Sequence, residues 1–376
     1  MDFALNDEQA QLQDSLARLL SSHYSFEDRR HIAASESGWS NAMWARYAEL
    51  GLLALPIAAE HGGFDGGASE LLPVMEALGR SLTLEPYLST IVLCARALQL
   101  AGSAAQQAQY LPAIAQGQLR MAWARTEWNR ADDATAPLQT RARRDGNGGW
   151  LLEGDKSMVL HGADAHAWIV SAEVHDHGAV LLGPGLFLVE KGALGTTLSA
   201  YKLIDQTPAA DLRLRSTPAT ALGEPGMAQH TIDAVQAAGL AAVCARATGA
   251  MQAALDLTAD YLKTREQFGR AIGSNQTLQH RAAEMLIATE QARSMALLAA
   301  MAVDEPGAPA SARNLSLAKI VVGHEGRMVG QQAVQLHGGI GMTEEYAVGH
   351  YLRHLTVLNQ LFGDVSAHQR RVAAMG

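Results

Sequence analysis

The chain has 376 residues, a formal net charge of −9 and a hydrophobic fraction of 48%. Its length allows two or three domains, and its composition is that of an ordinary globular protein. Because nucleic-acid phosphates are bound by a basic face, the acidic balance argues against a nucleic-acid partner. The N-terminus lacks a basic segment before an apolar core, and no apolar run of about 18 residues is uninterrupted. We therefore expect neither a signal peptide nor a membrane span.

Three stretches of different periodicity follow one another along the chain. Residues 1–118 place apolar side chains such as Leu12 and Leu16 at helical spacing, and predict an N-terminal helical domain. Residues 119–224 have short apolar runs between turns, and predict a middle β-domain. Residues 225–376 contain four long helical patterns with apolar faces, and predict a C-terminal four-helix bundle. The predicted fold class is therefore α+β.

The residue types that bind metals do not form a convincing site. Cys94 and Cys244 stand in apolar helical contexts without metal-ligand spacing, so we predict buried free thiols in a reducing compartment, the cytoplasm. His350 and His354 lie four residues apart in HYLRH, which suits a metal, but no third ligand accompanies them. We predict packing or surface histidines and no metal site.

The stretch REQFGRAIGSNQ, residues 265–276, interrupts two long helical patterns. Arg265 stands in the last turn before Gly269, where a cation complements the end of a helix whatever its function. Together with Phe268 and Gln276, however, it forms a corner with a permanent cation, a flat aromatic ring and an amide. Such a set suits a nucleotide phosphate, because arginine binds phosphate with a planar fork and an aromatic ring packs on a base. Both interpretations stay open on the residues alone.

A second glycine-rich segment, GGIG at Gly338–Gly341, follows the helical pattern QQAVQLH. It lacks the GxGxxG spacing and a preceding strand, so it does not predict a dinucleotide-binding βαβ unit. Two glycines at the end of a helix either cap it or let a ligand approach the backbone closely. Neither a GxSxG nucleophile turn nor a Walker loop is present in the sequence.

Three segments together resemble the acyl-CoA dehydrogenase family. YLKTREQFGRAIGSNQTLQHRAAEM is similar to its arginine and QFG corner, QLHGGIGMTEEY to its flavin-contacting segment, and MWARYAELGLLALPIAAEHGGF to its N-terminal domain. The resemblance covers nearly the whole chain and repeats the predicted domain order. In detail the sequence most resembles the small subunits of pimeloyl-CoA dehydrogenases.

The resemblance implies an FAD enzyme of fatty acid metabolism that converts an acyl-CoA thioester to a 2-enoyl-CoA. In the family a carboxylate removes the α-proton, a hydride goes to the flavin, and the electrons pass to an electron-transferring flavoprotein. The resemblance also implies residues that contact the adenosine diphosphate part of FAD in a neighbouring subunit. These are Arg265, Gln267, Phe268, Gly269 and Gln276, with Gln335, Gly338 and Gly339.

The chain departs from the family where the catalytic base should stand. The usual glutamate position is occupied by Phe362, which cannot accept a proton. Two alternative positions on the first long C-terminal helix hold Gly239 and Arg246. A base must reach the substrate in its deprotonated form, so none of these qualifies. Asp364 is the nearest acid and a weak candidate, two residues from the usual place.

The residues that the family uses to contact its own flavin are also changed. Thr126 remains in TEWNRADD, but the small Gly-Ser pair of the family has become Ala131 and Asp132. The family's Trp-Ile-Thr segment reads MVL, so Met158 and Leu160 replace the tryptophan and the hydroxyl donor. Contacts made to a neighbouring subunit's FAD thus persist while those to the chain's own FAD are lost.

Three functions fit these residues. In the first, the chain is the incomplete subunit of an α2β2 acyl-CoA dehydrogenase, as in relatives that act on steroid side chains and dicarboxylic acyl chains, and lends its Arg265 corner to a second, complete subunit. In the second, it is a self-sufficient homo-oligomeric dehydrogenase with an atypical base such as Asp364. In the third, it is a flavin-free scaffold on the same fold.

Overall fold

The computed structural model describes residues 7–128, 137–146, 148–176, 180–308 and 310–375. The chain divides into two compact units, each built from segments that are distant in sequence. The bundle unit consists of Met1–His31, Ala68–Thr83 and Leu240–Gly376, and the sheet unit of Ile32–Gly67 and Leu84–Gly239. The domain boundaries expected near residues 119 and 225 stay a prediction, because each unit combines residues from more than one predicted domain.

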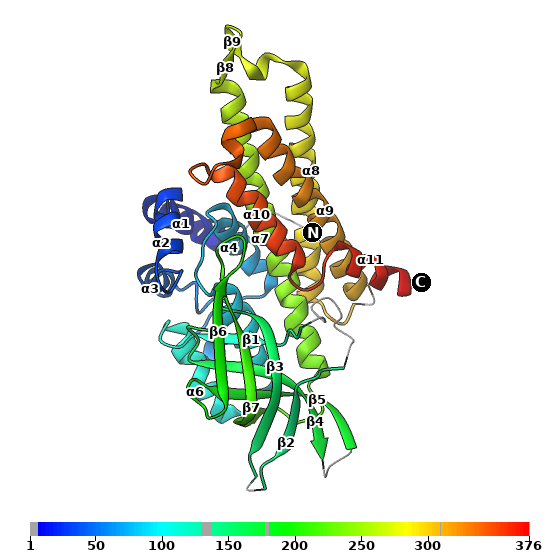
Figure 1. Cartoon of the computed structure of the whole chain (residues 1–376). Helices are drawn as coiled ribbons and strands as arrows, with labels where there is room; N and C mark the ends of the chain where they lie inside the picture. Colours follow the sequence, from blue (N-terminus) through cyan, green and yellow to red (C-terminus); the bar gives the residue numbers. More distant parts are fainter. Residues whose placement is uncertain (1–6, 129–136, 147, 177–179, 309, 376) are drawn as a thin grey trace. The chain divides into compact units, whose positions relative to one another are not determined.

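The elements confirm the α+β class: helical regions stand on both sides of a β region in the sequence (Figure 1). The α-helices are α1 Asp7–His23, α2 Phe26–Ala34, α3 Asn41–Glu49, α4 Ala68–Arg80, α5 Arg96–Ala101, α6 Ala104–Ala115, α7 Gln229–Thr264, α8 Gln276–Asp304, α9 Ser311–His337, α10 Ala347–Gln360 and α11 Val365–Ala374. The other helices are the 3-10 helices η1 Ala59–His61, η3 Ile272–Ser274 and η4 Gly338–Met342 and the π-helix η2 Tyr87–Ala95. The strands are β1 Met121–Ala124, β2 Arg141–Arg144, β3 Trp150–Leu160, β4 Ala167–Asp176, β5 Val180–Glu190, β6 Thr196–Lys202, β7 Pro208–Leu222, β8 Glu266–Gln267 and β9 Arg270–Ala271.

Small residues set the packing of the long helices in the bundle unit. α8 buries Ala288, Ala292, Ala296 and Ala299, a strip of residues three or four positions apart that share one face of the helix. Alanine is the best helix former and loses no side-chain entropy on burial, so this strip favours both the helix and close packing. α9 packs against α8, α10 and α11 (Figure 1). The sequence analysis predicted four of these helices and did not anticipate α11.

Helices α4 and α7 cross at backbone contact. A Cβ added at Gly79 would lie 1.9 Å from the carbonyl oxygen of Arg246. On the neighbouring turn, a Cβ added at Gly249 would lie 1.9 Å from the carbonyl oxygen of Glu76. Any larger residue at either glycine would therefore push the two helices apart. This contact fixes the middle of α7 against α4 within the bundle unit.

The strands of the sheet unit close on themselves. The order is β1-β4-β2-β3-β7-β5, and an additional β4–β5 pairing completes a ring, while β6 pairs with β7. Strand β1 and strand β2 both run parallel to β4, at successive stretches of it. Aromatic residues such as Trp150 and Phe187, whose ring centroids are 5.3 Å apart, fill the interior with aliphatic side chains. Closing the sheet removes most of its exposed edges.

Among the residues that the structure describes, one helix, α8, is long and apolar enough to cross a membrane by length and composition alone. Within its most apolar window, 44% of the residues are buried inside the structure, where α8 packs against α9. A buried core helix passes the same test, so the finding is weak evidence for a membrane span.

Candidate functional site

The corner predicted from REQFGRAIGSNQ is a tight hairpin between α7 and α8. Strands β8 and β9 pair Gln267 with Arg270, which leaves Phe268 and Gly269 as a two-residue turn. Both turn residues have positive φ, 53° for Phe268 and 76° for Gly269, as a type I′ turn requires. Glycine adopts this conformation freely, whereas a residue with a Cβ is destabilised there by about 1–2 kcal/mol.

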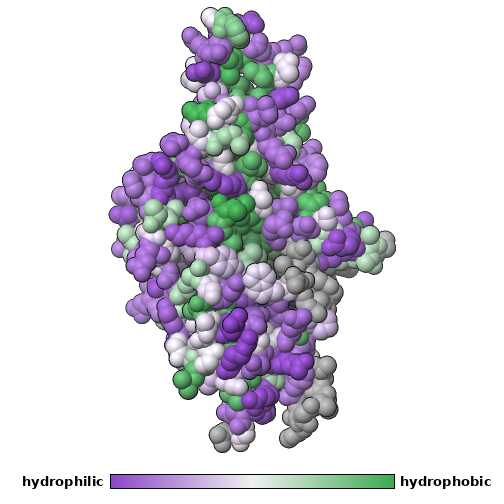
Figure 2. Space-filling view, viewed as in Figure 1, coloured by the Kyte–Doolittle hydropathy of each residue, from purple (hydrophilic) through white to green (hydrophobic). Residues whose placement is uncertain are grey.

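The ring of Phe268 is fully exposed, with a relative accessibility of 101%, so packing within the chain does not offset the strain of its backbone. In Figure 2 apolar residues stand among hydrophilic ones at the end of the bundle that carries this hairpin. Strain held without compensating contacts is found where a segment serves recognition. The hairpin thus presents a rigid aromatic ring to solvent.

Polar groups suited to an anion occur in the same stretch of chain as this ring. Arg265 and Gln276 are exposed, and within the described part of the chain no group bonds the guanidinium of Arg265. By contrast, the neighbouring Arg270 donates to the side-chain oxygen of Asn275 at 3.1 Å. Asn275 precedes α8 without a side-chain cap, which leaves the amide end of α8 open. Helix N-termini and arginine forks both bind phosphate.

Gly338 and Gly339 lie on the same side of the bundle unit as the hairpin. His337, the last residue of α9, stacks on Tyr261 of α7 with ring centroids 4.5 Å apart, and the backbone NH of Arg265 donates to the carbonyl oxygen of Tyr261 at 2.8 Å. Both glycines are exposed, and no heavy atom lies within 4 Å of a Cβ added at either one. Gln335, two residues before the end of α9, is also exposed. The structure thus brings the two predicted ligand-contacting segments to one end of the bundle.

The loop between α10 and α11 holds the position expected for the base. Phe362 is half-buried, with φ of 63°, and is followed by Gly363 with φ of 96°. The carbonyl oxygen of Phe362 is 3.0 Å from Nε2 of His368, and the ring itself carries no group that accepts a proton. Asp364 caps α11, with Oδ1 accepting from the backbone NH of Ala367 at 2.7 Å. Its carboxylate therefore has a structural role in this loop.

The other two positions considered for a base lie on α7. Gly239 has no side chain to act, and Arg246 is a buried cation that donates to the Thr83 carbonyl oxygen and, at 3.1 Å, to Nε2 of His354. His350 is buried as well, with Nδ1 3.3 Å from the guanidinium of Arg29. The HYLRH histidines are therefore packing residues. No metal-binding group of His, Cys, Asp and Glu occurs among the residues that the structure describes.

In the sheet unit, the segments that resemble flavin contacts run beside each other. The carbonyl oxygen of Thr126 accepts from the backbone NH of Ser157 at 2.9 Å. Met158 has φ of 51°, and its NH is 3.1 Å from the hydroxyl of Tyr201. Leu160 is buried and offers no hydroxyl. Ala131 and Asp132 lie outside the described residues.

A buried ion pair that the sequence analysis did not predict holds these two segments together. Lys156 Nζ lies 2.7 Å from Glu127 Oε1, and both side chains are almost fully buried. Burial lowers the pKa of Lys156 to about 8, although the Glu127 carboxylate favours the charged form. Burial raises the pKa of Glu127, but the nearby ammonium and several NH donors outweigh it, so that pKa is lowered. Glu127 also accepts from the backbone NH groups of Gln139 and Thr140, and so ties the residues that follow β1 to those that precede β2.

A second missed residue, Trp123, stands on β1 three residues before Thr126. Its side chain is buried, and its indole NH has no hydrogen-bond partner among the described residues. Buried donors are normally paired, so an orphan donor calls for an explanation such as a ligand atom. A single tryptophan in an apolar strand carries no signal in the sequence that would distinguish it from a core residue.

These observations test the fit of the FAD that the sequence resemblance implies. The open glycines, the exposed arginine and the uncapped end of α8 fit its adenosine diphosphate part, whose phosphates need NH donors and positive charge. In the sheet unit the fit is partial: the Trp123 indole NH can donate to an acceptor atom, whereas Leu160 cannot.

The chain matches two models of one family. Residues 6–118 match the model described as acyl-CoA dehydrogenase, N-terminal domain, and residues 237–376 match acyl-CoA dehydrogenase, C-terminal domain. Acyl-CoA dehydrogenase fadE12 of Mycobacterium bovis is 30% identical over 341 residues, which is 87% of this chain and 84% of that protein. Acryloyl-CoA reductase (NADH) of Anaerotignum propionicum is 28% identical over 387 residues, or 99% of this chain and 95% of that protein.

Solved structures show the same fold. The Tcur3481-Tcur3483 steroid ACAD is similar with a TM-score of 0.87 and 30% identity over 98% of this chain and 97% of that one. Butyryl-CoA dehydrogenase from Megasphaera elsdenii has a TM-score of 0.89 at 24% identity, over 100% of this chain and 99% of that one, and supports the fold alone.

Proposed function

The chain belongs to the acyl-CoA dehydrogenase family, and on that premise we propose that it is the base-lacking subunit of a heteromeric enzyme. Members of the family are FAD-dependent oxidoreductases of fatty acid metabolism that act on CH–CH donors. The proposed substrate is an acyl-CoA thioester, and the proposed electron acceptor is an electron-transferring flavoprotein. The two buried free thiols fit a reducing compartment such as the cytoplasm.

One observation carries this proposal: the corner for a phosphate ligand is present, while the position of the base holds a side chain that cannot take a proton. Arg265, Phe268 and Gln276 are exposed, and so are Gly338 and Gly339. A chain that kept this corner only for its own structure would have no reason to present a strained, fully exposed aromatic ring. We therefore assign the corner to FAD bound mainly by another chain.

The base position supports the same assignment. Abstraction of an α-proton needs a deprotonated group within reach of the substrate. Phe362 supplies none, and the carboxylate of Asp364 caps α11. In the proposed enzyme the second, complete subunit supplies the base, and this chain supplies positioning contacts to the phosphates and the adenine of FAD.

A relative suggests the assembly. The 30% identical solved structure is named for two chains, Tcur3481 and Tcur3483, and for a steroid substrate class. We extend to this chain the pairing of two different subunits, α2β2, and leave the acyl group open. The likeness to pimeloyl-CoA dehydrogenase small subunits is a proposal of the same kind.

One observation favours a second candidate, the self-sufficient homo-oligomer. The orphan indole NH of Trp123 stands on the strand that leads to Thr126, where a flavin held by this chain's own sheet unit would find a donor. In that case each chain holds its own FAD and lends its Arg265 corner to an identical neighbour. Asp364 would then need to leave its capping contact to act as a base.

The flavin content of the purified protein decides between these functions. We expect the chain expressed alone to carry little FAD and to leave an acyl-CoA unchanged. Co-expressed with an acyl-CoA dehydrogenase-like chain encoded beside it, it should copurify with one FAD for each pair of unlike chains and should support dehydrogenation. A full complement of FAD and turnover by the chain alone would establish the homo-oligomer instead. A flavin-free complex with the second chain would leave only the scaffold function.

A further inference from the structure

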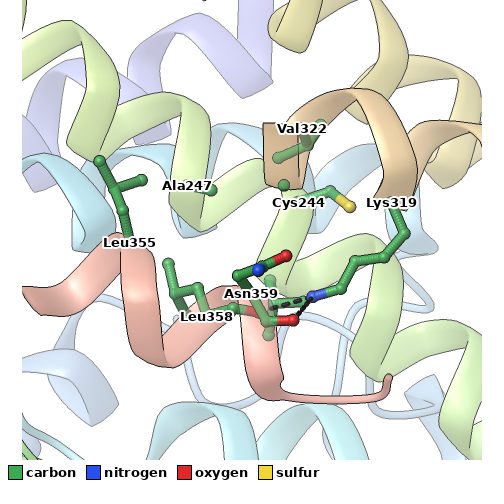
Figure 3. Close-up of a pocket in the computed structure, with 9 residues that line it drawn as sticks. Cys244, Ala247, Lys319, Val322, Leu355, Leu358 and Asn359 are labelled. Atoms are coloured by element: carbon green, nitrogen blue, oxygen red, sulfur yellow. Dashed lines mark hydrogen bonds between the residues drawn. The ribbon is translucent and has the colours of Figure 1, made fainter. Parts of the chain in front are cut away.

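A small cavity lies inside the bundle unit where α7, α9 and α10 meet (Figure 3). Its walls are mostly aliphatic, as Val322, Leu355 and Leu358 show. Two polar side chains, Lys319 of α9 and Asn359 of α10, also line it, together with the thiol of Cys244. The close-up shows Lys319 extending along the cavity to the end of α10, with the amide of Asn359 beside it.

The ammonium of Lys319 is buried and uses two of its three NH donors. Nζ donates to the carbonyl oxygen of Leu358 at 2.6 Å and to that of Asn359 at 3.1 Å. These carbonyls lie in the last turn of α10, where they have no partner in the helix, so Lys319 caps α10 at its C-terminal end. In the described part of the chain, no acceptor is recorded for the third NH.

Asn359 has the complementary need: its side-chain oxygen is an acceptor that lacks a donor in the described part of the chain. Its Oδ1 is buried and has no hydrogen-bond partner among the described residues. The amide lies against the α9 backbone, because a Cβ added at Gly323 would be 2.3 Å from Oδ1. A buried carbonyl oxygen left unbonded is destabilising by about 1–3 kcal/mol, so a native structure normally satisfies it.

The size of the cavity selects the ligand. The space open to the centre of a water-sized molecule is only ≈ 10 Å³, so the cavity suits a ligand as small as water, which needs two to four polar partners. Lys319 Nζ can donate to such a water, Asn359 Oδ1 can accept from it, and the neutral thiol of Cys244 is a weak third partner. Burial raises the pKa of that thiol to about 11, which keeps it neutral.

We propose that this cavity binds one ordered water molecule that bridges the Lys319 ammonium and the Asn359 side chain. The water accepts a hydrogen bond from the third NH of Lys319 and donates one to Oδ1 of Asn359. One molecule thus pairs both groups. It thereby stabilises the lysine cap on α10 and the start of the loop that carries Phe362. This site is independent of the flavin, so it holds whether or not the proposed function is correct.

Replacement of Asn359 by leucine gives opposite results with and without the water. If the oxygen were unbonded, Asn359→Leu would remove a buried unsatisfied group and stabilise the protein. With the water in place, the same change removes a satisfied bridge and leaves an NH of Lys319 unpaired. We expect the unfolding constant in urea to rise about 5- to 10-fold, the usual effect of losing a buried hydrogen-bonded group.

The experiment has a matched control and a direct readout. Gln360→Leu places the same side chain on the exposed neighbouring position of α10 and should change the unfolding constant little. A crystal structure of the full chain should show a density peak at about 2.7–3.2 Å from both Nζ and Oδ1, and that peak should be absent in Asn359→Leu. An unchanged or lower unfolding constant in Asn359→Leu, or an empty cavity in a well-resolved wild-type map, would overturn the proposal.

Discussion

Two Phe-Gly turns in the described part of the bundle unit have similar positive φ angles and opposite surroundings. Phe268 and Gly269 have φ of 53° and 76°, and Phe362 and Gly363 have φ of 63° and 96°. The ring of Phe268 is fully exposed, whereas that of Phe362 is half-buried in a loop tied by its carbonyl oxygen to His368. Both turns place a bulky residue in a backbone region that favours glycine.

The difference shows that similar backbone strain occurs both with and without compensating contacts. At Phe362 the surrounding contacts compensate for the strain, so the residue is explained by packing within the chain. Among the described residues, no packing contact of the Phe268 ring offsets the strain, which is what the proposed contact with a ligand or another chain would explain. Exposure thus separates a recognition turn from a structural turn when sequence and backbone geometry do not.

The largest expected effect concerns the recognition turn. Arg265→Ala in the proposed two-subunit complex should weaken FAD binding by about 10- to 100-fold, the equivalent of a charge-assisted hydrogen bond of about 1.5–3 kcal/mol. Flavin release measured by fluorescence during dilution would give the affinity. Lys263→Ala removes an exposed cation from the same end of α7 and should leave the affinity nearly unchanged. If both changes weakened FAD binding equally, Arg265 would act only through its positive charge and not through a specific contact.

The structural turn should show its own pH dependence through His368. Burial lowers the pKa of His368 to about 4, and the nearby cations Arg371 and Lys319 act in the same direction, against the Phe362 carbonyl and Asp364. Because the folded-state pKa is below the unfolded value of about 6.5, the folded state binds fewer protons and loses stability as pH falls from about 6.5 to 4. At pH 5 this contribution is about 2 kcal/mol.

Urea unfolding at pH 7 and pH 5 tests this assignment. The loss of stability between the two pH values should be smaller by about 2 kcal/mol in His368→Gln than in the wild type. The same loss in both proteins would show that His368 titrates normally and that the loop is more open than the structure indicates.

Replacement of each phenylalanine by alanine should affect the unfolding free energy differently at the two turns. Phe362→Ala removes partly buried apolar surface and should lower the unfolding free energy by about 1–2 kcal/mol, without affecting FAD binding. Phe268→Ala removes only exposed surface and should change stability by less than about 0.5 kcal/mol, while weakening FAD binding in the complex. Paired thermal unfolding and flavin titration would record both. A large loss of stability in Phe268→Ala alone would mean that the ring packs within the isolated chain.

The smallest effect is expected from relief of strain. Phe268→Gly removes the Cβ that opposes positive φ, so the isolated chain should gain up to about 1 kcal/mol in unfolding free energy. The variant should still lose affinity for the flavin, since the ring is gone. A stabilised protein with weakened FAD binding would demonstrate that Phe268 is retained for recognition at the expense of stability.

The sequence allowed much of the fold to be predicted, because the evidence for it is local. Helical periodicity, short strand-like runs and turn residues each depend on neighbours within a few positions, and they gave the α+β class in the correct chain order. The absence of a carboxylate at Phe362, the position that the family resemblance assigns to the base, could also be read directly, since it needs no geometry. The corner residues Arg265 and Gln276 were found because they are close together in the sequence.

Other features depended on residues that meet only when the chain folds. Lys156 and Glu127 lie 29 positions apart, and burial of the pair follows from how β3 passes the chain after β1. Asp364 resembled a substitute base until the structure placed its carboxylate on the first turn of α11. The site of Lys319 and Asn359 spans 40 positions and exists only because α9 and α10 pack side by side.

The sequence by itself therefore determined the class of fold, the absence of a carboxylate at position 362 and the presence of a cation and an aromatic ring in one short stretch. Only the tertiary structure decided that the ring of Phe268 is exposed under strain, that Gly338 joins it at one end of the bundle, and that Asp364 is a helix cap. The physical reason is that composition and periodicity act over a few residues, whereas exposure, burial and hydrogen-bond partners are set by segments brought together from far along the chain.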